Sequence, residues 1–279
     1  MLSIGMTQWV VGNESMDRSF ERLNRYGYDE VEFAAEPYTL DAEVCVALMN
    51  QYGLKCHSLC GIYNDERDLT ASGDTGEKAI QYLRDSVDFA VKVGAEIIIV
   101  VPSPVGRTVK PKGKSMEELR ENVINNLRVA ADYAKEKGIK LAIETINRYE
   151  TYFINTIPDA LQLIDEINHP AVGVMADLFH MNIEERSSID SIYAAKEKLL
   201  HVHIADNTRE AAGMGQTDFK EILRVLKSIG YKGSLTMEFM YKVSNPYAAV
   251  EMDTRSDLMD QYAKQAIDYI RLLDKSIAM

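Results

Sequence analysis

The sequence predicts a single (β/α)8 barrel, the TIM-barrel class of α/β fold, with residues 1–279 forming one domain. Eight short apolar runs alternate with longer amphipathic segments, as in parallel strands that are each followed by a helix. The length of 279 residues is close to the roughly 250 residues typical of this barrel. No linker or low-complexity tract divides the chain. A doubly wound parallel sheet is the alternative, but no glycine-rich fingerprint follows the first apolar run.

The eight predicted strands are short and nearly continuously apolar, a pattern typical of strands buried on both faces. In chain order they cover residues 2–6, 30–34, 55–60, 96–101, 140–145, 171–176, 199–205 and 234–239.

The segments between the strands carry apolar residues at the i, i+3, i+4 and i+7 spacing of a helix face. The clearest examples are residues 19–27, 77–94, 115–138 and 218–230. Several predicted helices end at a glycine shortly before the next strand, as helix C-caps do. These glycines are Gly27, Gly53, Gly94, Gly138 and Gly230.

Composition excludes several classes of protein. The net charge of −12, with no basic patch that extends along the chain, disfavours nucleic acid as a partner. No run approaches the roughly 18 apolar residues of a membrane span, and the N-terminus lacks the basic region of a secretory signal. Cys45, Cys56 and Cys60 are odd in number and form no CxxC pair. We therefore expect neither a disulfide framework nor a membrane protein, and a cytoplasmic location.

Ionisable residues stand at or near the ends of four successive predicted strands, where the active sites of such barrels lie. They are Glu144, Asp177, His203 and Glu238. Burying such groups is unfavourable unless they are paired or coordinated. Three carboxylates and one imidazole suit Mn2+, Co2+ or Mg2+, and Zn2+ remains compatible. The alternative is that a carboxylate only caps the helix after its strand, as Asp177 could.

Two further ionisable residues fit a structural role better. His201 points to the same side of its strand as His203 but lies deeper, which favours a hydrogen-bonded core histidine. Glu32, near the end of the second strand, could contact substrate, but a buried salt bridge is the better interpretation.

Four blocks of sequence resemble the D-tagatose/D-allulose (psicose) 3-epimerase family of the xylose isomerase-like TIM-barrel superfamily. They are LAIETINRYE (141–150), GVMADLFHMNIEE (173–185), HVHIADNTREAAGMGQTDF (201–219) and SLTMEF (234–239). The resemblance is dense in the C-terminal half and follows the N-terminal half only in outline.

The resemblance implies an isomerase that inverts C3 of a ketose through an enediolate, with one divalent metal per chain. Glu144, Asp177, His203 and Glu238 match the metal ligands, and the two glutamates match the pair that exchanges protons with the substrate. Glu150, His180 and Arg209 match residues that hold the ketose near its carbonyl; the alternatives are a surface ion pair and a packing histidine. Mn2+ or Co2+ is the expected metal, and a homo-dimer or homo-tetramer the expected assembly.

Other positions have two open interpretations. Cys60 and Gly61 resemble a pair that lines the sugar site, but Cys60 could equally be a small buried thiol. Trp9 and Tyr63 could stack on the sugar or simply close the barrel. The basic loop 103–115 could be a lid over an anionic substrate, although a solvated loop is favoured.

Met240 replaces an aromatic residue that is usual in the family, and loop 103–115 lacks one as well. These departures affect the identity of the sugar rather than the chemistry.

Several other functions use the same scaffold. An aldose–ketose, inosose or keto-acid-sugar isomerase or epimerase would use the same metal site, and a lyase subunit acting on keto-sugars is conceivable. A zinc endonuclease is disfavoured because it needs more than the 5 histidines present and a basic face. A non-catalytic sugar-binding barrel is disfavoured because both glutamates and all the ligands are retained.

Overall fold

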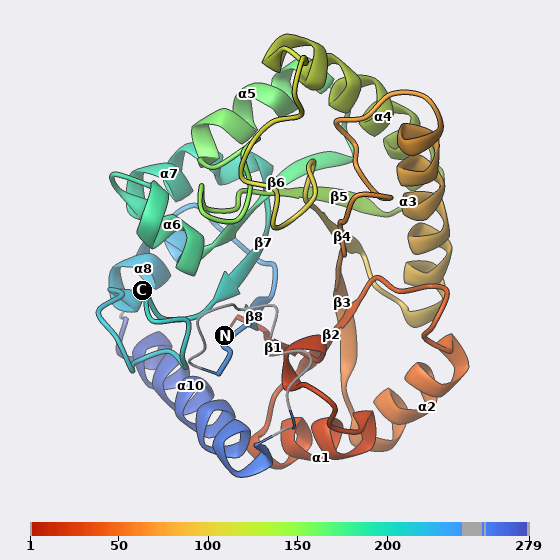
Figure 1. Cartoon of the computed structure of the whole chain (residues 1–279). Helices are drawn as coiled ribbons and strands as arrows, with labels where there is room; N and C mark the ends of the chain where they lie inside the picture. The colour runs from red at the N-terminus through yellow and green to blue at the C-terminus, as the bar shows by residue number, and fades with distance from the viewer. Residues whose placement is uncertain (1, 242–252, 254, 278–279) are drawn as a thin grey trace.

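A closed barrel of eight parallel strands forms the centre of the molecule, with helices around its outside (Figure 1). The computed structural model describes residues 2–241, 253 and 255–277. Each strand pairs with the next along the chain, and β8 pairs with β1 to close the barrel. The strands are β1 (Ile4–Thr7), β2 (Glu30–Ala34), β3 (Lys55–Cys60), β4 (Ile97–Val100), β5 (Lys140–Glu144), β6 (Val172–Asp177), β7 (Leu199–Ile204) and β8 (Leu235–Met237). The predicted fold class and all eight strands are thus confirmed.

The apolar runs form strands because both faces of the barrel wall are buried. Every residue of β4 and of β6 is buried, since one face lies inside the barrel and the other lies under the helices. Because side chains alternate along a strand, every second residue points inward. The inward-facing apolar residues form a small cluster of their own inside the barrel: Cys60, Ile97, Ile99, Ala142 and Met175.

The helices cover the barrel and begin mostly at side-chain caps. They are α1 (Met16–Tyr26), α2 (Ala42–Tyr52), α3 (Asp74–Val93), α4 (Met116–Glu136), α5 (Ile157–Ile167), α6 (Leu178–Glu184), α7 (Ser188–Ala195), α8 (Phe219–Ser228) and α10 (Ser256–Ser276), with 3-10 turns η1 (Trp9–Val11) and η2 (Lys196–Lys198). Ser15 and Ser115 accept hydrogen bonds from the first turns of α1 and α4. Gly27, Gly53 and Gly94 end their helices in the left-handed conformation, as predicted. Gly138 and Gly230 adopt it one residue beyond the cap.

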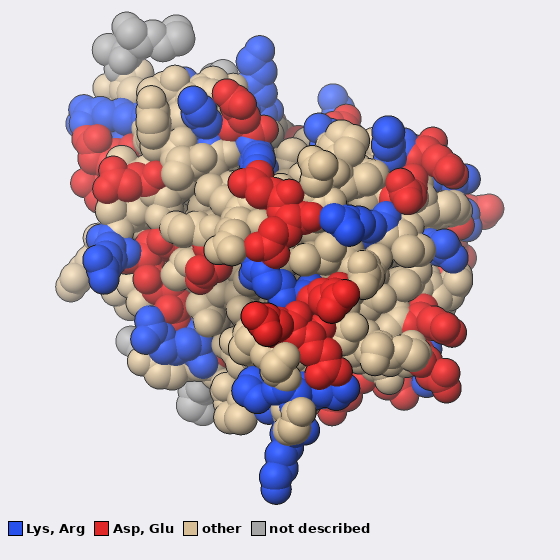
Figure 2. Space-filling view, turned by 90° about the horizontal axis from the view of Figure 1, so that it is seen from above, with Lys and Arg blue, Asp and Glu red and all other residues tan. Residues whose placement is uncertain are grey.

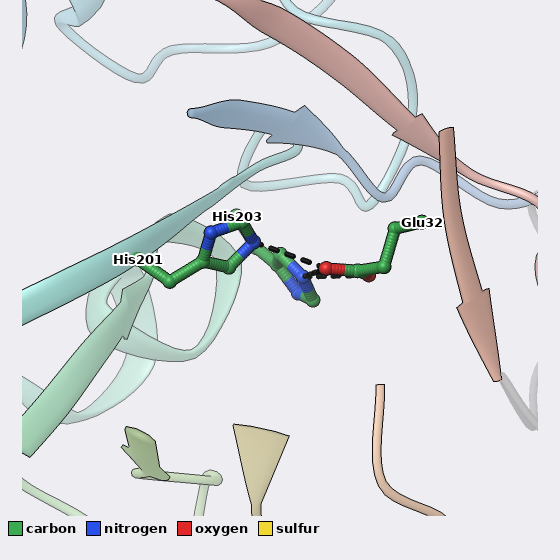
Figure 3. A group of neighbouring side chains, drawn as sticks. All are labelled: Glu32, His201 and His203. Atoms are coloured by element: carbon green, nitrogen blue, oxygen red, sulfur yellow. Dashed lines mark hydrogen bonds and ion pairs between the residues drawn. The ribbon is translucent and has the colours of Figure 1, made fainter. Parts of the chain in front are cut away.

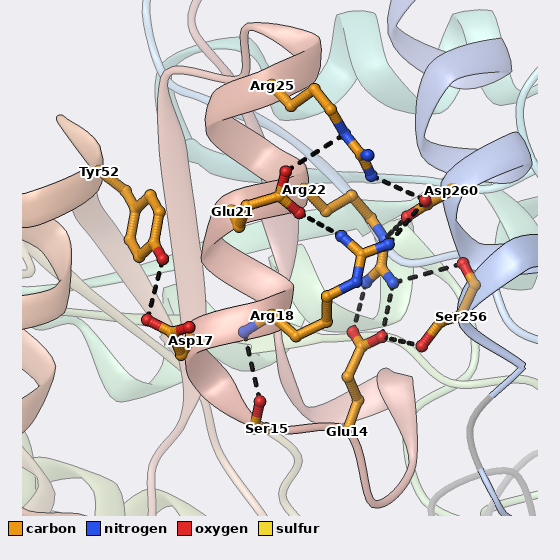
Figure 4. Close-up of polar contacts among 10 residues, drawn as sticks. All are labelled: Glu14, Ser15, Asp17, Arg18, Glu21, Arg22, Arg25, Tyr52, Ser256 and Asp260. Carbon is orange, nitrogen blue, oxygen red and sulfur yellow. Dashed lines mark hydrogen bonds and ion pairs between the residues drawn. The ribbon is translucent and has the colours of Figure 1, made fainter.

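α10 packs against α1, so the last helix of the chain lies beside the first (Figure 1). A polar cluster joins them, with Arg22 and Glu14 buried at its centre (Figure 4). The fully buried Arg22 donates two hydrogen bonds to Glu14, of 2.5 and 2.6 Å, and one of 2.6 Å to Asp260. Ser256, at the start of α10, donates a hydrogen bond to Glu14 as well. The cluster therefore links the first helix of the chain to the last one.

On the face drawn in Figure 2, acidic and basic side chains are intermixed, without one continuous basic region in that view. Among the described helices, none is long and apolar enough to cross a membrane. The prediction that residues 1–279 form one domain stays a prediction, because residues 1, 242–252, 254 and 278–279 lie outside the described part of the chain.

Candidate functional site

A cavity of about 420 Å3 lies at the C-terminal ends of the strands. Its size falls in the range of about 300–1,000 Å3 that is usual for small-molecule sites. All the residues predicted to contact substrate or to exchange protons line it: Trp9, Cys60, Gly61, Glu144, Glu150, His180, Arg209 and Glu238. The barrel thus brings together residues that are spread over most of the sequence.

The four predicted metal ligands converge at one side of this cavity. Glu144 and Asp177 are the last residues of β5 and β6, His203 lies near the end of β7, and Glu238 directly follows β8. In the sheet Asp177 pairs with His203, which puts their side chains at the same level. One ligand atom from each of the four residues lies within 4.8 Å of the others, and all four residues are buried.

Asp177 caps a helix and also belongs to the group of candidate metal ligands. Its Oδ1 accepts a hydrogen bond of 2.7 Å from the backbone N–H of Phe179 and caps α6. Its Oδ2 accepts a hydrogen bond of 3.1 Å from Arg209, which lines the cavity. Helix capping therefore leaves one oxygen of Asp177 available to a metal ion.

His203 belongs both to the group of candidate metal ligands and to a second buried group, which it forms with Glu32 and His201 (Figure 3). Its Nε2 lies 3.0 Å from Glu32 Oε1, and its Nδ1 lies 3.2 Å from Glu238 Oε2. Glu32 also contacts His201 Nε2 at 3.0 Å and accepts a hydrogen bond of 2.5 Å from Ser58. The separate predictions of a hydrogen-bonded core histidine at His201 and of a buried salt bridge at Glu32 are confirmed.

When the ring nitrogen that does not bind the metal donates a hydrogen bond to a carboxylate, this bond fixes the orientation of a metal-binding histidine and increases its basicity. Glu32 has this relation to His203 Nε2, which leaves Nδ1 directed toward the carboxylates. His203 Nδ1 is buried and makes no hydrogen bond among the described residues. Three carboxylate oxygens and this nitrogen match the donor set of Mn2+, Co2+ or Mg2+, so the residues fit a divalent cation.

The close packing of buried carboxylates shifts their proton affinities. Burial, and then the charge of Glu238, raise the pKa of Glu144 well above its usual range. Burial also raises the pKa of Glu238, against the opposing attraction of His203 and Arg209. Burial alone would raise the pKa of Asp177, but Arg209, His180 and His203 together outweigh it and hold that pKa below its usual range. The carboxylates therefore need positive charge nearby to be ionised together.

His180 presents a hydrogen-bond donor to the cavity. Asn147 donates to its Nδ1 from the side-chain nitrogen at 2.8 Å and from the backbone N–H at 3.4 Å. Burial lowers the pKa of His180 to about 4, so the ring is neutral at pH 7. Because Nδ1 is the acceptor, the proton sits on Nε2, which lies 3.9 Å from Glu144 and 3.6 Å from Asp177. Asn147 also donates a hydrogen bond of 2.7 Å to Glu150 and so positions both predicted substrate contacts.

Arg209 stands between two of the carboxylates. It donates to Asp177 Oδ2 at 3.1 Å and to Glu238 Oε2 at 2.7 Å, and its guanidinium lies 4.4 Å from the ring centre of Phe179. Its backbone has φ of 62°, an uncommon conformation for a residue other than glycine. The surrounding structure has to hold this backbone in place.

Asp206 holds the loop that presents Arg209. Its carboxylate accepts backbone N–H groups at both ends of the loop, from residues 207, 213, 215 and 217, at 2.8 to 3.1 Å. Its carbonyl accepts the N–H of Arg209 at 2.8 Å. The sequence alone gave no role to Asp206 or Asn147, although both stand inside the blocks that carry the family resemblance. It gave no role either to Glu36, which also lines the cavity.

Gly61 has no room for a side chain. A Cβ at this position would lie 2.3 Å from the carbonyl oxygen of Ile99 and 2.6 Å from the ring of Tyr63. Cys60 is buried, and burial raises the pKa of its thiol well above the usual range, which makes it a neutral wall of the cavity. The basic loop 103–115 contributes Val105 to the cavity wall, whereas Lys110, Lys112 and Lys114 are exposed.

Comparison with known proteins agrees with the fold and the site. The sequence pattern of the xylose isomerase-like TIM barrel family matches residues 20–272. The chain belongs to that family. Within it, the chain is 32% identical over 254 residues to the L-ribulose 3-epimerase of Methylomonas sp. (strain DH-1), covering 88% of this chain and 87% of the relative. This relationship places it among the carbohydrate epimerases of the xylose isomerase-like family, which are isomerases.

Two further relatives extend the comparison. The crystal structure of a D-allulose 3-epimerase from Methylomonas sp. in complex with D-allulose superposes with a TM-score of 0.86 at 30% identity, covering 97% of this chain and 96% of that one. The 3-dehydro-D-guloside 4-epimerase of Escherichia coli is 28% identical over 260 residues, covering 89% of this chain and 96% of that enzyme.

Proposed function

We propose that this protein is a metal-dependent ketose 3-epimerase, which inverts C3 of a free keto-sugar with Glu144 and Glu238 as its acid–base pair. The observation that carries the proposal is that both glutamates are buried, belong to the candidate metal cluster and line the same cavity. The proposal is also supported by the relatives named L-ribulose 3-epimerase and D-allulose 3-epimerase.

Inversion requires two groups, because a proton leaves one face of the carbon and another arrives at the opposite face. One glutamate, ionised, would take the C3 proton, and the other, protonated, would supply one. The neighbouring carboxylates push their pKa values apart, and this favours such a division of protonation states. A divalent cation held by Glu144, Asp177, His203 and Glu238 would stabilise the negative charge that develops on the substrate oxygens. Mn2+ and Co2+ are the metals we propose.

The other residues at the cavity would bind and orient the sugar. His180 can donate a hydrogen bond from Nε2, and Glu150, held by Asn147, can accept one. Arg209 can add charge-assisted hydrogen bonds to substrate oxygens. Trp9 and the Cys60–Gly61 pair would form the wall against which the sugar packs.

The cavity suits an uncharged sugar better than a sugar phosphate. Among its described lining residues, Arg209 is the one with a permanent positive charge, and Asp177 and Glu238 already bind it. Glu36 and Glu150 add negative charge to the wall. A phosphate group would therefore find no uncommitted positive side chain among these described lining residues.

The three buried thiols carry no disulfide, which is consistent with a cytoplasmic location.

A second candidate is the same inversion one carbon further along a 3-keto-glycoside. The E. coli relative named 3-dehydro-D-guloside 4-epimerase favours it, because that enzyme aligns over 96% of its length. The chemistry again moves a proton on a carbon next to a ketone, so the same residues would serve.

Proton NMR of the Mn2+-loaded protein in D2O, with fructose, allulose, tagatose, sorbose and ribulose, tests the proposal. Deuterium at C3 together with formation of the C3 epimer is the expected result. Deuterium at C1 with aldose formation would instead identify an aldose–ketose isomerase. If no free ketose exchanges but a 3-keto-glycoside does so at C4, the second candidate is correct.

A further inference from the structure

The wall of the cavity opposite the metal ligands carries polar groups that the proposed reaction does not use. In a closed barrel of eight strands, the ends of β2 and β3 lie across from those of β6 and β7, which carry Asp177 and His203. Glu36 follows β2 and Tyr63 follows β3, and both line the cavity. A sugar held at the metal ligands by its ketone end would therefore extend toward Glu36 and Tyr63.

Glu36 is a carboxylate with a fixed orientation. Arg67 donates to both of its oxygens, at 2.7 and 3.0 Å. Arg67 is fixed in turn by the carbonyl of Ile62 at 3.1 Å and by the ring of Tyr82, whose centre lies 4.1 Å from its guanidinium carbon. Each carboxylate oxygen has a further lone pair, so Glu36 can still accept a hydrogen bond from a ligand. Because Arg67 offsets its charge, the site suits a neutral hydroxyl.

Tyr63 supplies the complementary donor. The residue is 3% exposed, and its hydroxyl has no hydrogen-bond partner in the described part of the chain. Leaving a buried hydroxyl unpaired is unfavourable, so the position is suited to a ligand that completes it. The Tyr63 ring lies against Gly61 and edge-on to Tyr82, with 5.7 Å between ring centres, which holds the hydroxyl in place.

We infer that Glu36 and Tyr63 form a distal subsite that binds the terminal hydroxyl of a six-carbon ketose. The inference rests on the proposed function, which puts the ketone at the metal ligands. Of the two arms of a ketose beyond its reacting carbons, the C4–C6 arm is the one long enough to reach across the cavity. A sugar without the terminal hydroxyl would leave Tyr63 and Glu36 unpaired in the complex, and it should react more slowly for that reason.

The test pairs D-allulose with 6-deoxy-D-allulose, which differ in that one hydroxyl. For the Mn2+-loaded wild-type enzyme we expect kcat/KM to be about tenfold lower with the deoxy sugar, the effect of one or two hydrogen bonds. In Tyr63→Phe and Glu36→Ala this ratio should fall toward one, because each variant lacks one of the two groups that bind the terminal hydroxyl of D-allulose. Tyr38→Phe and Glu43→Ala, both outside the cavity lining, are matched controls that should keep the wild-type ratio. A ratio unchanged in both test variants would overturn the subsite.

A binding measurement separates this inference from the proposed reaction. Trp9 is the single tryptophan of the chain and lines the cavity, so its fluorescence reports on occupancy. If the wild-type protein leaves C3 of every ketose unchanged, the proposed function fails, and the subsite is judged by titrating Trp9 fluorescence with the same two sugars. Tighter binding of D-allulose, with the difference removed in Tyr63→Phe, would support the subsite. Equal binding of both sugars, or no response to either, would overturn it.

Discussion

At the scale of single residues, the site concentrates buried negative charge that the protein itself offsets only in part. Glu144, Asp177 and Glu238 offer oxygens within 4.8 Å of one another and of His203. Arg209 donates hydrogen bonds to Asp177 and Glu238, whereas burial and the charge of Glu238 raise the pKa of Glu144 well above its usual range. Since a buried carboxylate is either neutralised by a proton or paired with a positive charge, Glu144 is the residue most dependent on a bound cation.

The two glutamates should be separately essential. We expect Glu144→Gln and Glu238→Gln each to lower kcat by about 10^2- to 10^4-fold, because an amide cannot exchange the C3 proton. Both residues are also candidate ligands, so elemental analysis must show that the variant still binds metal. Glu30 is the first residue of β2 and so lies at the end of the barrel away from the cavity; Glu30→Gln is the control and should keep full activity. Full turnover in either metal-loaded site variant would contradict the two-base scheme.

Glu32 should act on the metal through His203. Replacing it with Gln weakens the hold on His203 Nε2, and such outer contacts typically contribute about 10- to 100-fold to metal affinity. Competition with a chelator should therefore show Mn2+ binding weakened by that factor in Glu32→Gln. An unchanged affinity would mean that His203 is oriented by its strand alone.

At the scale of elements, periodicity predicted the strands and helices well, but contacts between distant elements could not be inferred from it. Arg22 belongs to the predicted helix 19–27, where spacing alone marks it as one more polar residue. In the structure it is fully buried because Glu14 and Asp260 approach it from segments 8 and 238 positions away. Asp206 is a similar case, because the backbone N–H groups that donate to its carboxylate come together only once the loop has folded around it.

The α1–α10 contact should depend on Arg22 far more than on its exposed neighbour. Removing one partner from a buried ion pair leaves an uncompensated charge and typically costs about 3–5 kcal/mol. We expect Arg22→Ala to lower the free energy of urea unfolding by about that amount. Arg25 contacts the same Asp260 at 2.7 Å, but its side chain is 43% exposed, so Arg25→Ala should cost less than about 1 kcal/mol. Equal losses in the two variants would show that burial does not set the strength of this contact.

At the scale of the whole molecule, barrel closure explains which parts of the site were predictable. Residues that end parallel strands must meet at one rim, so Glu144, Asp177, His203 and Glu238 could be grouped before their distances were known. The opposite wall depends on the loops after β2 and β3, where Glu36 meets Arg67 through loop geometry rather than strand register. The sequence therefore indicated the group of candidate metal ligands, and on the opposite wall it suggested Tyr63 but not Glu36.

The candidate metal ligands come from four strands, so a bound metal should stabilise the whole barrel as well as support turnover. Removing metal with a chelator should abolish activity, and Mn2+ or Co2+ should restore it. A ligand that binds only the folded state adds about 2.7 kcal/mol at one hundred times its Kd. For a chain of this size that corresponds to a rise in Tm of about 5 °C. Asp177→Asn, which weakens one ligand, should reduce this rise. Activity that survives verified metal removal would contradict the metal-dependent mechanism, whereas restored activity without a rise in Tm would show that the unfolded chain binds the metal as well.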